Sequence, residues 1–369
     1  MKIRSIVIEN YRNYEQVKLN FDEKLNIIVG DNAQGKTNLL EAVYVSGFGK
    51  SFRTNKESDL IHFDKEFGSV RIEILKDNGL LETIEYRILS NNKKAFLING
   101  VNITKISELL GTVNIILFYP DDLKLIKDSP QERRKFINRE LSHINKIYCL
   151  DIIEYSRILV QRNELLKKMS YKPEFKDMVE VWDEQLSDKG ARLIVKRNQF
   201  IHSLDEISRD IHSRITDGKE QLSVKYITAV KNRDNYDTIK FELLDQLKKN
   251  SEMDFRRGFT SVGPHRDDLE ILINGINIKS FGSQGQQRTA ALSLKLSEIE
   301  IVKNEVGEYP ILLLDDVMSE LDINRQKDLI YAIKGVQTII TTTDIKNLLD
   351  DYINDSKIIK IKNGNVIGH

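Results

Sequence analysis

The stretch that decides the fold is Gly30-Asp31-Asn32-Ala33-Gln34-Gly35-Lys36-Thr37. It fits the pattern G-x-x-x-x-G-K-[ST] and lies between a buried-strand pattern and a helical pattern, which is the context that gives the motif its meaning. Glycines let the backbone wrap phosphate groups, while the loop N–H groups and the helix N-terminus supply positive potential. We therefore expect all eight residues to bind ATP, with Lys36 at the β- and γ-phosphates and the Thr37 hydroxyl on Mg²⁺. The alternative is a glycine-containing turn with a surface lysine.

A second motif supplies two carboxylates at the end of a short apolar strand. The strand runs from Ile311 to Leu314, and Asp315 and Asp316 follow it. A buried strand delivers Asp315 to the edge of the sheet beside the phosphate loop, where it can hold Mg²⁺. Asp316 points the other way on a strand, so we expect it to orient or deprotonate water at the γ-phosphate. Asp316 and Lys36 are thus the expected catalytic residues. The alternative is a charged strand end that faces solvent.

A third motif precedes a predicted helix, and its residues are Gly282-Ser283-Gln284-Gly285-Gln286-Gln287. Here the chain resembles the ABC-type ATPases, whose signature runs Leu-Ser-Gly-Gly-Gln before a helix. Ser283, Gly285 and Gln286 match that signature, whereas Gly282 and Gln284 depart from it. The resemblance implies that the three matching residues bind the γ-phosphate held by a second subunit, so that ATP lies between two heads. Taken alone, the stretch also fits a Gly/Gln loop with a helix cap.

The acidic strand is followed by Ser319-Glu320-Leu321-Asp322, which resembles the D-loop of the same ATPases. Two positions depart from the transporter-type members. No histidine occurs between Val336 and Lys346, where their switch histidine is expected, and the shorter Asp316 replaces their catalytic glutamate. We therefore expect a slow, switch-like hydrolysis cycle rather than fast turnover.

Further stretches narrow the resemblance to the bacterial RecF family of recombination mediators. They are Asn10 to Tyr14, Phe118 to Asp122, Ser129 to Phe136, Gly263 to Asp268 and Leu313 to Asp322. The resemblance spans nearly the whole chain and implies a weak DNA-dependent ATPase that forms a homodimer with ATP on DNA near single-strand gaps. It further implies that Arg12 contacts the cofactor. The implied partners are RecO and RecR, which help to load RecA during repair and replication-fork recovery.

Hydrophobic spacing predicts the remaining elements. Alternating runs in the first and last thirds predict strands, and three hairpin turns are expected, at Asp77-Asn78-Gly79, Asn99-Gly100 and Asn274-Gly275. Between them, apolar residues recur three or four apart from Ile137 to Leu159 and from Phe175 to Ile211, which predicts two long helices packed antiparallel. The residues Ser129-Pro130-Gln131-Glu132 predict the start of the first helix, with a capping box.

We expect an α/β fold: an ABC-type ATPase head, built from a phosphate-loop core sheet and an antiparallel β subdomain, with an inserted helical domain that contains a short antiparallel helix hairpin. Residues 1–126 form the N-terminal part of the head, 127–257 the insertion, and 258–369 the C-terminal part with the signature, the acidic strand and the D-loop. The chain has no internal repeat or Ser/Pro-rich linker, which favours an insertion over a separate domain.

Charge is unevenly distributed although its total is zero, with 56 basic and 56 acidic residues. The segment 127–257 carries +4 and the flanking pieces together carry −4. On the second long helix, the basic residues are Lys189, Arg192, Lys196 and Arg197. Because no acidic residue interrupts this run and DNA phosphates need only positive charge at the right spacing, we expect the four to contact DNA. The alternative is an ordinary solvated helix face.

Cysteine usage and hydropathy indicate the compartment. A single cysteine, Cys149, excludes an internal disulfide and suggests a reducing environment. The N-terminus lacks a signal-peptide pattern, and no stretch approaches the ~18 apolar residues of a membrane span, so we expect a cytoplasmic protein without membrane contact. The histidines His143, His202 and His212 lack metal-ligand partners, and Trp182 fits a helix-packing seam. His265 stays open as structural or functional.

Two other functions stay open from the residues alone. One is the soluble nucleotide-binding subunit of a transporter, against which the missing switch histidine and the long inserted helices argue. The other is an ATP-dependent interaction scaffold with negligible turnover. The ATPase rate with and without gapped DNA separates the scaffold from the DNA-dependent ATPase.

Overall fold

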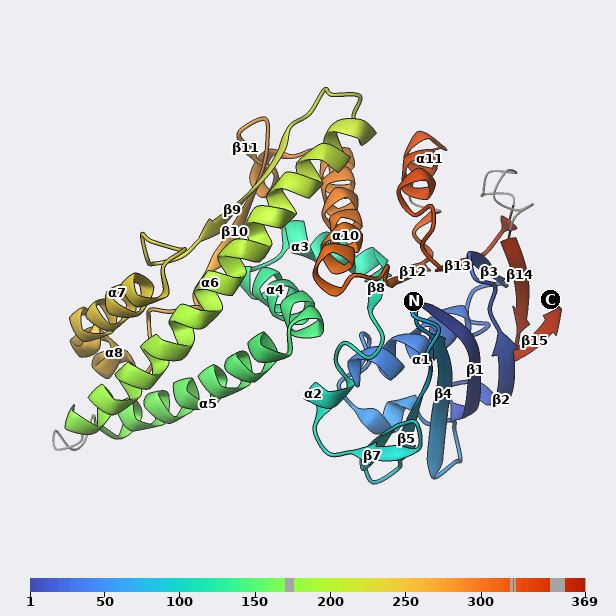
Figure 1. The fold of residues 1–369 in the computed structure, drawn as a ribbon, viewed down its shortest axis with the longest axis horizontal. Helices are drawn as coiled ribbons and strands as arrows, with labels where there is room; N and C mark the ends of the chain where they lie inside the picture. The colour runs from blue at the N-terminus through green and yellow to red at the C-terminus, as the bar shows by residue number, and fades with distance from the viewer. Residues whose placement is uncertain (170–175, 319–320, 322, 346–355, 369) are drawn as a thin grey trace. The chain divides into compact units, whose positions relative to one another are not determined.

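The structure, a computed structural model, describes residues 1–169, 176–318, 321, 323–345 and 356–368. Two compact units divide the chain, and Figure 1 shows the elements of both. The first unit consists of Met1–Asp122 and Lys295–His369, the second of Leu123–Leu294. This division differs from the predicted boundaries chiefly in residues 258–294, which we expected in the head. They belong to the second unit because residues 268–273 form a strand, and this strand pairs with residues 222–227 of the insertion.

The first unit contains a six-stranded core sheet with the order β15-β14-β3-β13-β12-β8. Its strands are β3 (Leu25–Val29), β8 (Ile115–Phe118), β12 (Ile311–Asp315), β13 (Thr338–Thr342), β14 (Ser356–Lys362) and β15 (Asn365–Gly368). All neighbours are parallel except the β14–β15 hairpin. Parallel strands covered on both faces form continuous apolar runs, which made β3 and β12 recognisable in the sequence. The four-residue β8 was not predicted.

A second, antiparallel sheet in the first unit has the order β2-β1-β4-β5-β6-β7. Its strands are β1 (Lys2–Tyr11), β2 (Tyr14–Asn20), β4 (Phe67–Leu75), β5 (Leu81–Leu89), β6 (Lys94–Ile98) and β7 (Val101–Ile103). The hairpin predicted at Asn99-Gly100 is confirmed, because both residues have positive φ between β6 and β7. Gly79 likewise has positive φ in the turn between β4 and β5.

The core of the first unit lies around α1 (Lys36–Phe48), the helix that follows β3. Side chains of α1 such as Leu39 and Val43 belong to one buried cluster with Ile72 of the antiparallel sheet and Ile339 of the core sheet. Burial on nearly all faces explains why α1 has no clear polar side, although the motif that precedes it is strong. The shorter helices of this unit are η1 (Glu57–Leu60), α2 (Ile106–Leu109) and α11 (Ile323–Ala332), and η2 (Pro120–Leu123) ends at its boundary.

The second unit is built on helices. They are α3 (Lys124–Lys127), α4 (Pro130–Ile144), α5 (Lys146–Met169), α6 (Lys176–Ile215), α7 (Tyr236–Lys249) and α8 (Ser251–Arg257). As predicted, α5 and α6 pack antiparallel, side by side in Figure 1. Ion pairs cross between them, from Arg162 to Asp183 and from Lys189 to both Asp151 and Glu154.

The first long helix of the prediction is in fact two helices. Asn145 adopts an extended backbone conformation after α4, and its side chain accepts a hydrogen bond from the N–H of Tyr148, which caps the start of α5. Ser129 precedes α4 and Pro130 is its first residue, as expected, but the Ser129 side chain makes no cap hydrogen bond. The predicted capping box is therefore wrong, whereas the predicted helix start is confirmed.

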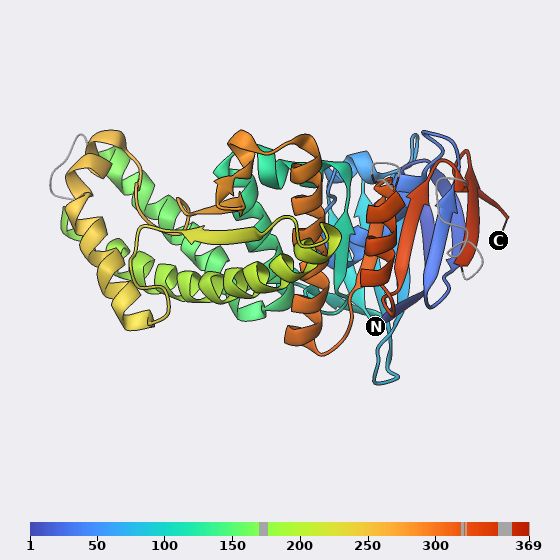
Figure 2. The same ribbon diagram turned by 90° about the horizontal axis from the view of Figure 1, so that it is seen from above.

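A small sheet with the order β11-β10-β9 completes the second unit. Its strands are β9 (Leu222–Ile227), β10 (Asp268–Ile273) and β11 (Ile276–Asn277), and α9 (Ile278–Phe281) and α10 (Gln284–Val306) follow. The predicted Asn274-Gly275 hairpin is confirmed. Figure 2 shows β9 running along α6, against which it packs.

The single residues assigned to packing behave as expected. Cys149 is buried, and Trp182 packs against Leu165, Leu166 and Val179 between α5 and α6. In the part of the chain that the structure describes, no helix combines the length and apolar character needed to cross a membrane.

Candidate nucleotide-binding site

The loop between β3 and α1 presents an open helix N-terminus. Gly35 is the residue before α1 and has a φ of 115°, and Ala33 has a φ of 64°, so the backbone curls back before the helix begins. No side chain caps α1, and no acidic residue occurs in its first turn. The first N–H groups of the helix are thus available to an anion, which the helix dipole also favours.

Lys36 is buried at the start of α1, and its ammonium group faces the loop. Its Nζ donates to the carbonyl oxygens of Gly30, at 2.6 Å, and Asp31, at 2.9 Å. Burial lowers the pKa of Lys36, although the charges of Asp316, Asp315 and Asp31 oppose this effect. A cation held by loop carbonyls and surrounded by carboxylates is positioned to bind phosphate oxygens.

Thr37 and Asp315 meet as the sequence predicted. The Thr37 hydroxyl donates to Oδ1 of Asp315 at 2.9 Å, which joins the first turn of α1 to the end of β12. The hydroxyl of Thr341, on the neighbouring strand β13, donates to the same oxygen at 2.8 Å. Burial raises the pKa of Asp315, and the two hydroxyls partly offset this rise. A hydroxyl and a carboxylate in contact are oxygen ligands of the kind that Mg²⁺ prefers, so these residues fit that ion.

Asp316 lies just beyond β12, where the backbone turns. Its φ is 55°, a left-handed conformation that is uncommon for residues other than glycine, and its N–H donates to the Thr341 hydroxyl at 2.9 Å. The alternation of a strand, on which we based its direction, therefore does not apply to it. Backbone strain of this kind is concentrated at functional sites.

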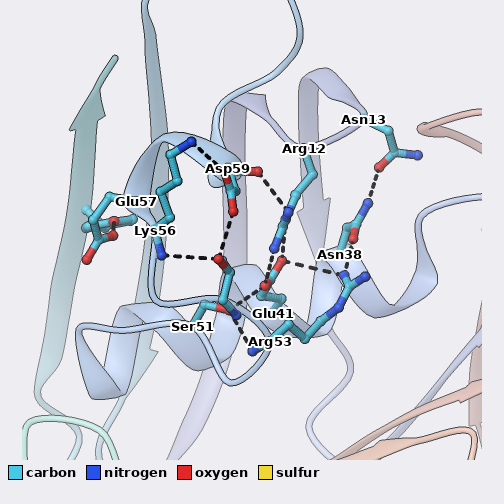
Figure 3. Close-up of polar contacts among 11 residues, drawn as sticks. Arg12, Asn13, Asn38, Glu41, Ser51, Arg53, Lys56, Glu57 and Asp59 are labelled. Carbon is cyan, nitrogen blue, oxygen red and sulfur yellow. Dashed lines mark hydrogen bonds and ion pairs between the residues drawn. The ribbon is translucent and has the colours of Figure 1, made fainter. Parts of the chain in front are cut away.

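Arg12, which the family resemblance placed at the cofactor, is bound to Glu41 of α1 (Figure 3). Its guanidinium donates to both carboxylate oxygens, at 2.8 and 2.7 Å, and also to the carbonyl of Asp59 at 2.8 Å. Burial lowers the pKa of Arg12, but the hydrogen bond and charge of Glu41 outweigh it, so the net shift is upward. Ser51 donates to the fully buried Glu41 at 2.6 Å, and Arg53 lies 3.8 Å from it.

Glu41 and Thr341 are the site residues that the sequence analysis did not identify. The sequence does mark Glu41 as a candidate, because it is an acidic residue inside the apolar run of α1. A charge in such a run requires a partner when the helix is buried. Thr341 stands in the segment where the switch histidine of transporter-type ATPases is missing. Its signal is a threonine directly after two isoleucines, on the strand next to the one that ends in the two acidic residues.

The signature residues lie together at the start of α10, in the second unit. Ser283 Oγ accepts from the N–H of Gln286 at 3.2 Å, and Gln286 Oε1 accepts from the N–H of Ser283 at 2.9 Å, so the two form a reciprocal capping box. Gln286 also donates to Glu220 at 2.9 Å. Gly285, which lies between Ser283 and Gln286 in the sequence, is half-buried. The D-loop prediction falls on Ser319, Glu320 and Asp322, which lie outside the described residues.

The four cations predicted to contact DNA do not form one surface stripe. Arg197 is 1 % exposed, and its guanidinium binds the Asp267 carboxylate, the Tyr148 hydroxyl and other buried oxygens. It therefore stabilises the interior of the second unit and is not available to DNA. Lys189 is 23 % exposed and pairs with Asp151, at 2.9 Å, and with Glu154. Arg192 is half-exposed, with Asp188 at 3.4 Å, and Lys196 is exposed.

His265 is bound on both sides of its ring. Nδ1 lies 2.7 Å from the Tyr155 hydroxyl, and Nε2 lies 3.0 Å from the carbonyl oxygen of Thr260. Because a carbonyl only accepts, this geometry assigns the hydrogen to Nε2 of a neutral ring. Burial, aided by the charge of Arg266, lowers its pKa to about 4 despite the Thr260 bond. Within the described residues, no group of three or more His, Cys, Asp or Glu side chains is arranged to hold a metal.

Comparison with known proteins covers nearly the whole chain. The family model described as RecF/RecN/SMC N terminal domain matches residues 2–365. The DNA replication and repair protein RecF of Clostridium botulinum (strain 657 / Type Ba4) is 46 % identical over 368 residues, 99 % of each chain. RecF of Alkaliphilus oremlandii is 47 % identical over 99 % of this chain and 100 % of its own.

Solved structures agree with the sequence relatives. A structure described as the recombination mediator protein RecF-ATPrS in the RecFOR pathway has a TM-score of 0.91 and 39 % identity, covering 99 % of this chain and 97 % of that one. An Smc head bound to the C-winged helix domain of ScpA has a TM-score of 0.57 at 18 % identity, which shows the fold alone. The predicted ABC-type ATPase head fold is thereby confirmed, and the chain belongs to the RecF family within the RecF/RecN/SMC group.

Proposed function

We propose that this protein is an ATP-dependent DNA-binding protein of replication and recombinational repair. It forms a homodimer with ATP at gapped DNA and, together with RecO and RecR, helps to load RecA. Its hydrolysis of ATP is weak, is stimulated by DNA and serves as a switch. Support comes from full-length relatives that are called DNA replication and repair proteins and from a relative that was solved as RecF-ATP in the RecFOR pathway.

The single observation that carries the ATPase part is the bond from Thr37 to Asp315. It joins the phosphate loop to the acidic strand in the way that a site for a nucleotide and a divalent cation requires. We infer that Thr37 and Asp315 hold Mg²⁺. When bound there, Mg²⁺ would neutralise negative charge on the phosphate oxygens of ATP.

The residues of the loop provide the remaining functions of the site. Lys36 exchanges the carbonyls of Gly30 and Asp31 for phosphate oxygens, and the open N–H groups of α1 bind the same anion. Asp316, held at its N–H by Thr341, orients or deprotonates the attacking water. An aspartate on a left-handed backbone reaches less far than a glutamate on a strand, which is consistent with slow turnover.

The signature residues Ser283, Gly285 and Gln286 complete the site of a second subunit in this proposal. Their capping box fixes the first turn of the 23-residue helix α10, and the positive end of the helix dipole at that turn favours an anion. Of the cations first assigned to DNA, Arg192 and Lys196 keep that assignment because they lie on the surface of α6.

Measurement of molecular size tests the proposal. The protein is sized with ATP, with ADP and without nucleotide, each with and without gapped DNA. We expect a dimer only with ATP, strengthened by gapped DNA. Lys36→Arg weakens this dimer, and Asp316→Asn traps it by slowing hydrolysis. A dimer that forms equally well without nucleotide contradicts the switch.

The ATPase rate separates this proposal from a scaffold without turnover. We expect gapped DNA to raise the rate of the wild-type protein and to leave the Asp316→Asn variant slow. Turnover that gapped DNA does not change favours the scaffold.

A further inference from the structure

Within the residues that the structure describes, three hairpins have a two-residue turn of asparagine followed by glycine with positive φ at both residues. The pairs are Asn99-Gly100, Asn274-Gly275 and Asn363-Gly364, and in each both residues have φ between 50° and 81°. This is the tight two-residue turn that matches the twist of the flanking strands. The three turns are therefore equivalent in backbone conformation.

Their surroundings are different. A Cβ atom added to Gly100 or to Gly275 would meet nothing within 4 Å. A Cβ added to Gly364 would lie 2.1 Å from the carbonyl oxygen of Asn13. The turn between β14 and β15 is thus packed directly against the backbone of the turn between β1 and β2, whereas the other two turns have open space at their glycine.

The same turn binds the phosphate loop through Gln34. The N–H of Asn363 donates to the side-chain oxygen of Gln34 at 2.7 Å, and the N–H of Gly364 donates to its backbone carbonyl at 3.0 Å. Asn13 donates from its side chain to that carbonyl as well, also at 3.0 Å. Two donors from separate elements therefore fix the direction of one carbonyl in the loop.

Fixing this carbonyl also fixes a donor. In a planar trans peptide the N–H points opposite to the C=O, so the carbonyl of Gln34 held toward the hairpin directs the N–H of Gly35 away from it. The next carbonyl, that of Gly35, is held by the hydroxyl of Tyr14 at 2.9 Å. The two peptides just before α1 are thus oriented by contacts from outside the loop.

We propose that the Asn363-Gly364 turn is a positioning element of the nucleotide site, which acts through Gln34 to direct the N–H groups of the phosphate loop toward phosphate. This inference rests on the proposed function, since it requires that the loop bind ATP. Coupling of this kind is reciprocal, so bound ATP also stabilises the hairpin of β14 and β15. The turn contributes position and makes no contact with phosphate itself.

A matched pair of substitutions tests the proposal. Gly364→Ala and Gly100→Ala place the same side chain on the same left-handed backbone, but only the former displaces Asn13 and with it Gln34. Affinity for ATP with Mg²⁺ is measured by calorimetry, and the apparent KM and kcat are measured beside it. We expect Gly364→Ala to weaken ATP binding about tenfold, the equivalent of one or two lost hydrogen bonds, with kcat at saturation less affected. Gly100→Ala stays within about twofold of wild type, because its strain is local.

Amide hydrogen exchange supplies a readout that a purely structural role would not change. In the wild-type protein, ATP slows exchange in residues 356–368 and leaves the Asn99-Gly100 turn unchanged. In Gly364→Ala this protection is lost. Gln34→Ala, which removes the acceptor of the Asn363 N–H, weakens ATP binding in the same direction, and the double variant is less affected than the sum of the two.

Each result has one meaning. Equal ATP affinity of the two glycine variants overturns this inference and leaves the proposed function standing, whereas a wild-type protein that binds no ATP contradicts the proposed function itself. Where Gly364→Ala fails to fold, Gln34→Ala decides: a folded variant with wild-type affinity and wild-type protection of residues 356–368 overturns the inference.

Discussion

Thr341 donates its hydroxyl to Oδ1 of Asp315 across the parallel strands β13 and β12, at 2.8 Å. The same hydroxyl accepts the N–H of Asp316 at 2.9 Å. One side chain on the neighbouring strand therefore contacts both acidic residues of the site. It belongs to the segment in which transporter-type ATPases would be expected to have a histidine.

We expect Thr341→Val to lower the ATPase rate at least tenfold while ATP affinity changes less than about threefold. Valine keeps the shape but leaves Oδ1 of the buried Asp315 with one donor fewer and the Asp316 N–H without its acceptor, a loss of about 1–3 kcal/mol. The rate and the affinity are measured separately. The matched control is Thr342→Val, whose hydroxyl donates to the carbonyl of Asp344 and contacts neither acid. Equal rates of the two variants would contradict the role of Thr341.

Arg12 and Glu41 should be strongly coupled in stability. Removal of either partner leaves a buried charge, so each single alanine variant should lose about 3 kcal/mol of unfolding free energy in urea. The double variant should lose at least ~1 kcal/mol less than the sum. The comparison pair is Arg71 and Glu85, which lie 3.0 Å apart on the antiparallel sheet. Because Arg71 is half-exposed, the coupling energy of this pair should stay below about 1 kcal/mol. Similar coupling in both pairs would rule out a special role for the buried one.

Arg197 and Lys196 are neighbours with opposite expected behaviour. Arg197→Met should destabilise the second unit by about 3–5 kcal/mol, because the buried Asp267 would lose the cation that balances its charge. Lys196→Ala should change stability by less than about 0.5 kcal/mol. In DNA binding, Lys196→Ala should weaken affinity for all sequences and reduce the salt slope by about one. If the double variant Lys196→Ala/Arg192→Ala binds DNA with unchanged affinity, this face of α6 does not contact DNA.

His265 should make stability depend on pH. Its pKa is about 4 in the folded protein against 6.5 in the unfolded chain, so only the unfolded chain takes up a proton as the pH falls between these values. Stability is therefore complete above about pH 6.5 and is lost toward pH 4, by about 3 kcal/mol in total. Urea unfolding of His265→Gln should show a flatter profile over this range. His202→Gln, on the exposed face of α6, should follow the wild-type profile, and parallel profiles for all three proteins would contradict the assignment.

The phosphate loop and its strands could be predicted because their signals are local. Lys36 and Thr37 are adjacent in a motif whose spacing sets the geometry, and the apolar run of β12 fixes where Asp315 ends. The contact of Thr37 with Asp315 follows from parallel strands whose carboxyl ends meet at one edge. Helix α10 and the turns at Asn99-Gly100 and Asn274-Gly275 also rest on neighbouring residues.

The remaining features depend on contacts between distant residues. Arg197 has no acidic neighbour in sequence, but Asp267 binds it in the fold, and helical spacing cannot reveal such a partner. Periodicity continues through Asn145 because α4 and α5 both bury apolar faces, so only the capping property of asparagine marked the break. The assignment of residues 258–294 depended on the pairing of β10 with β9, which sequence separation concealed.

The order of strands in the core sheet has a consequence for biogenesis. The strand β3 is flanked by β13 and β14, and about 300 residues separate Val29 from Thr338. At ~5–20 residues per second, a ribosome adds that length in roughly 15 to 60 s. Throughout this time the nascent β3 has two open edges, which are prone to aggregation, whereas the contiguous second unit, Leu123–Leu294, is complete before β13 is synthesised. A nascent chain interrupted before β13 therefore carries the entire phosphate loop but lacks the strands that flank β3. Nucleotide binding consequently indicates that synthesis has passed β13 and β14.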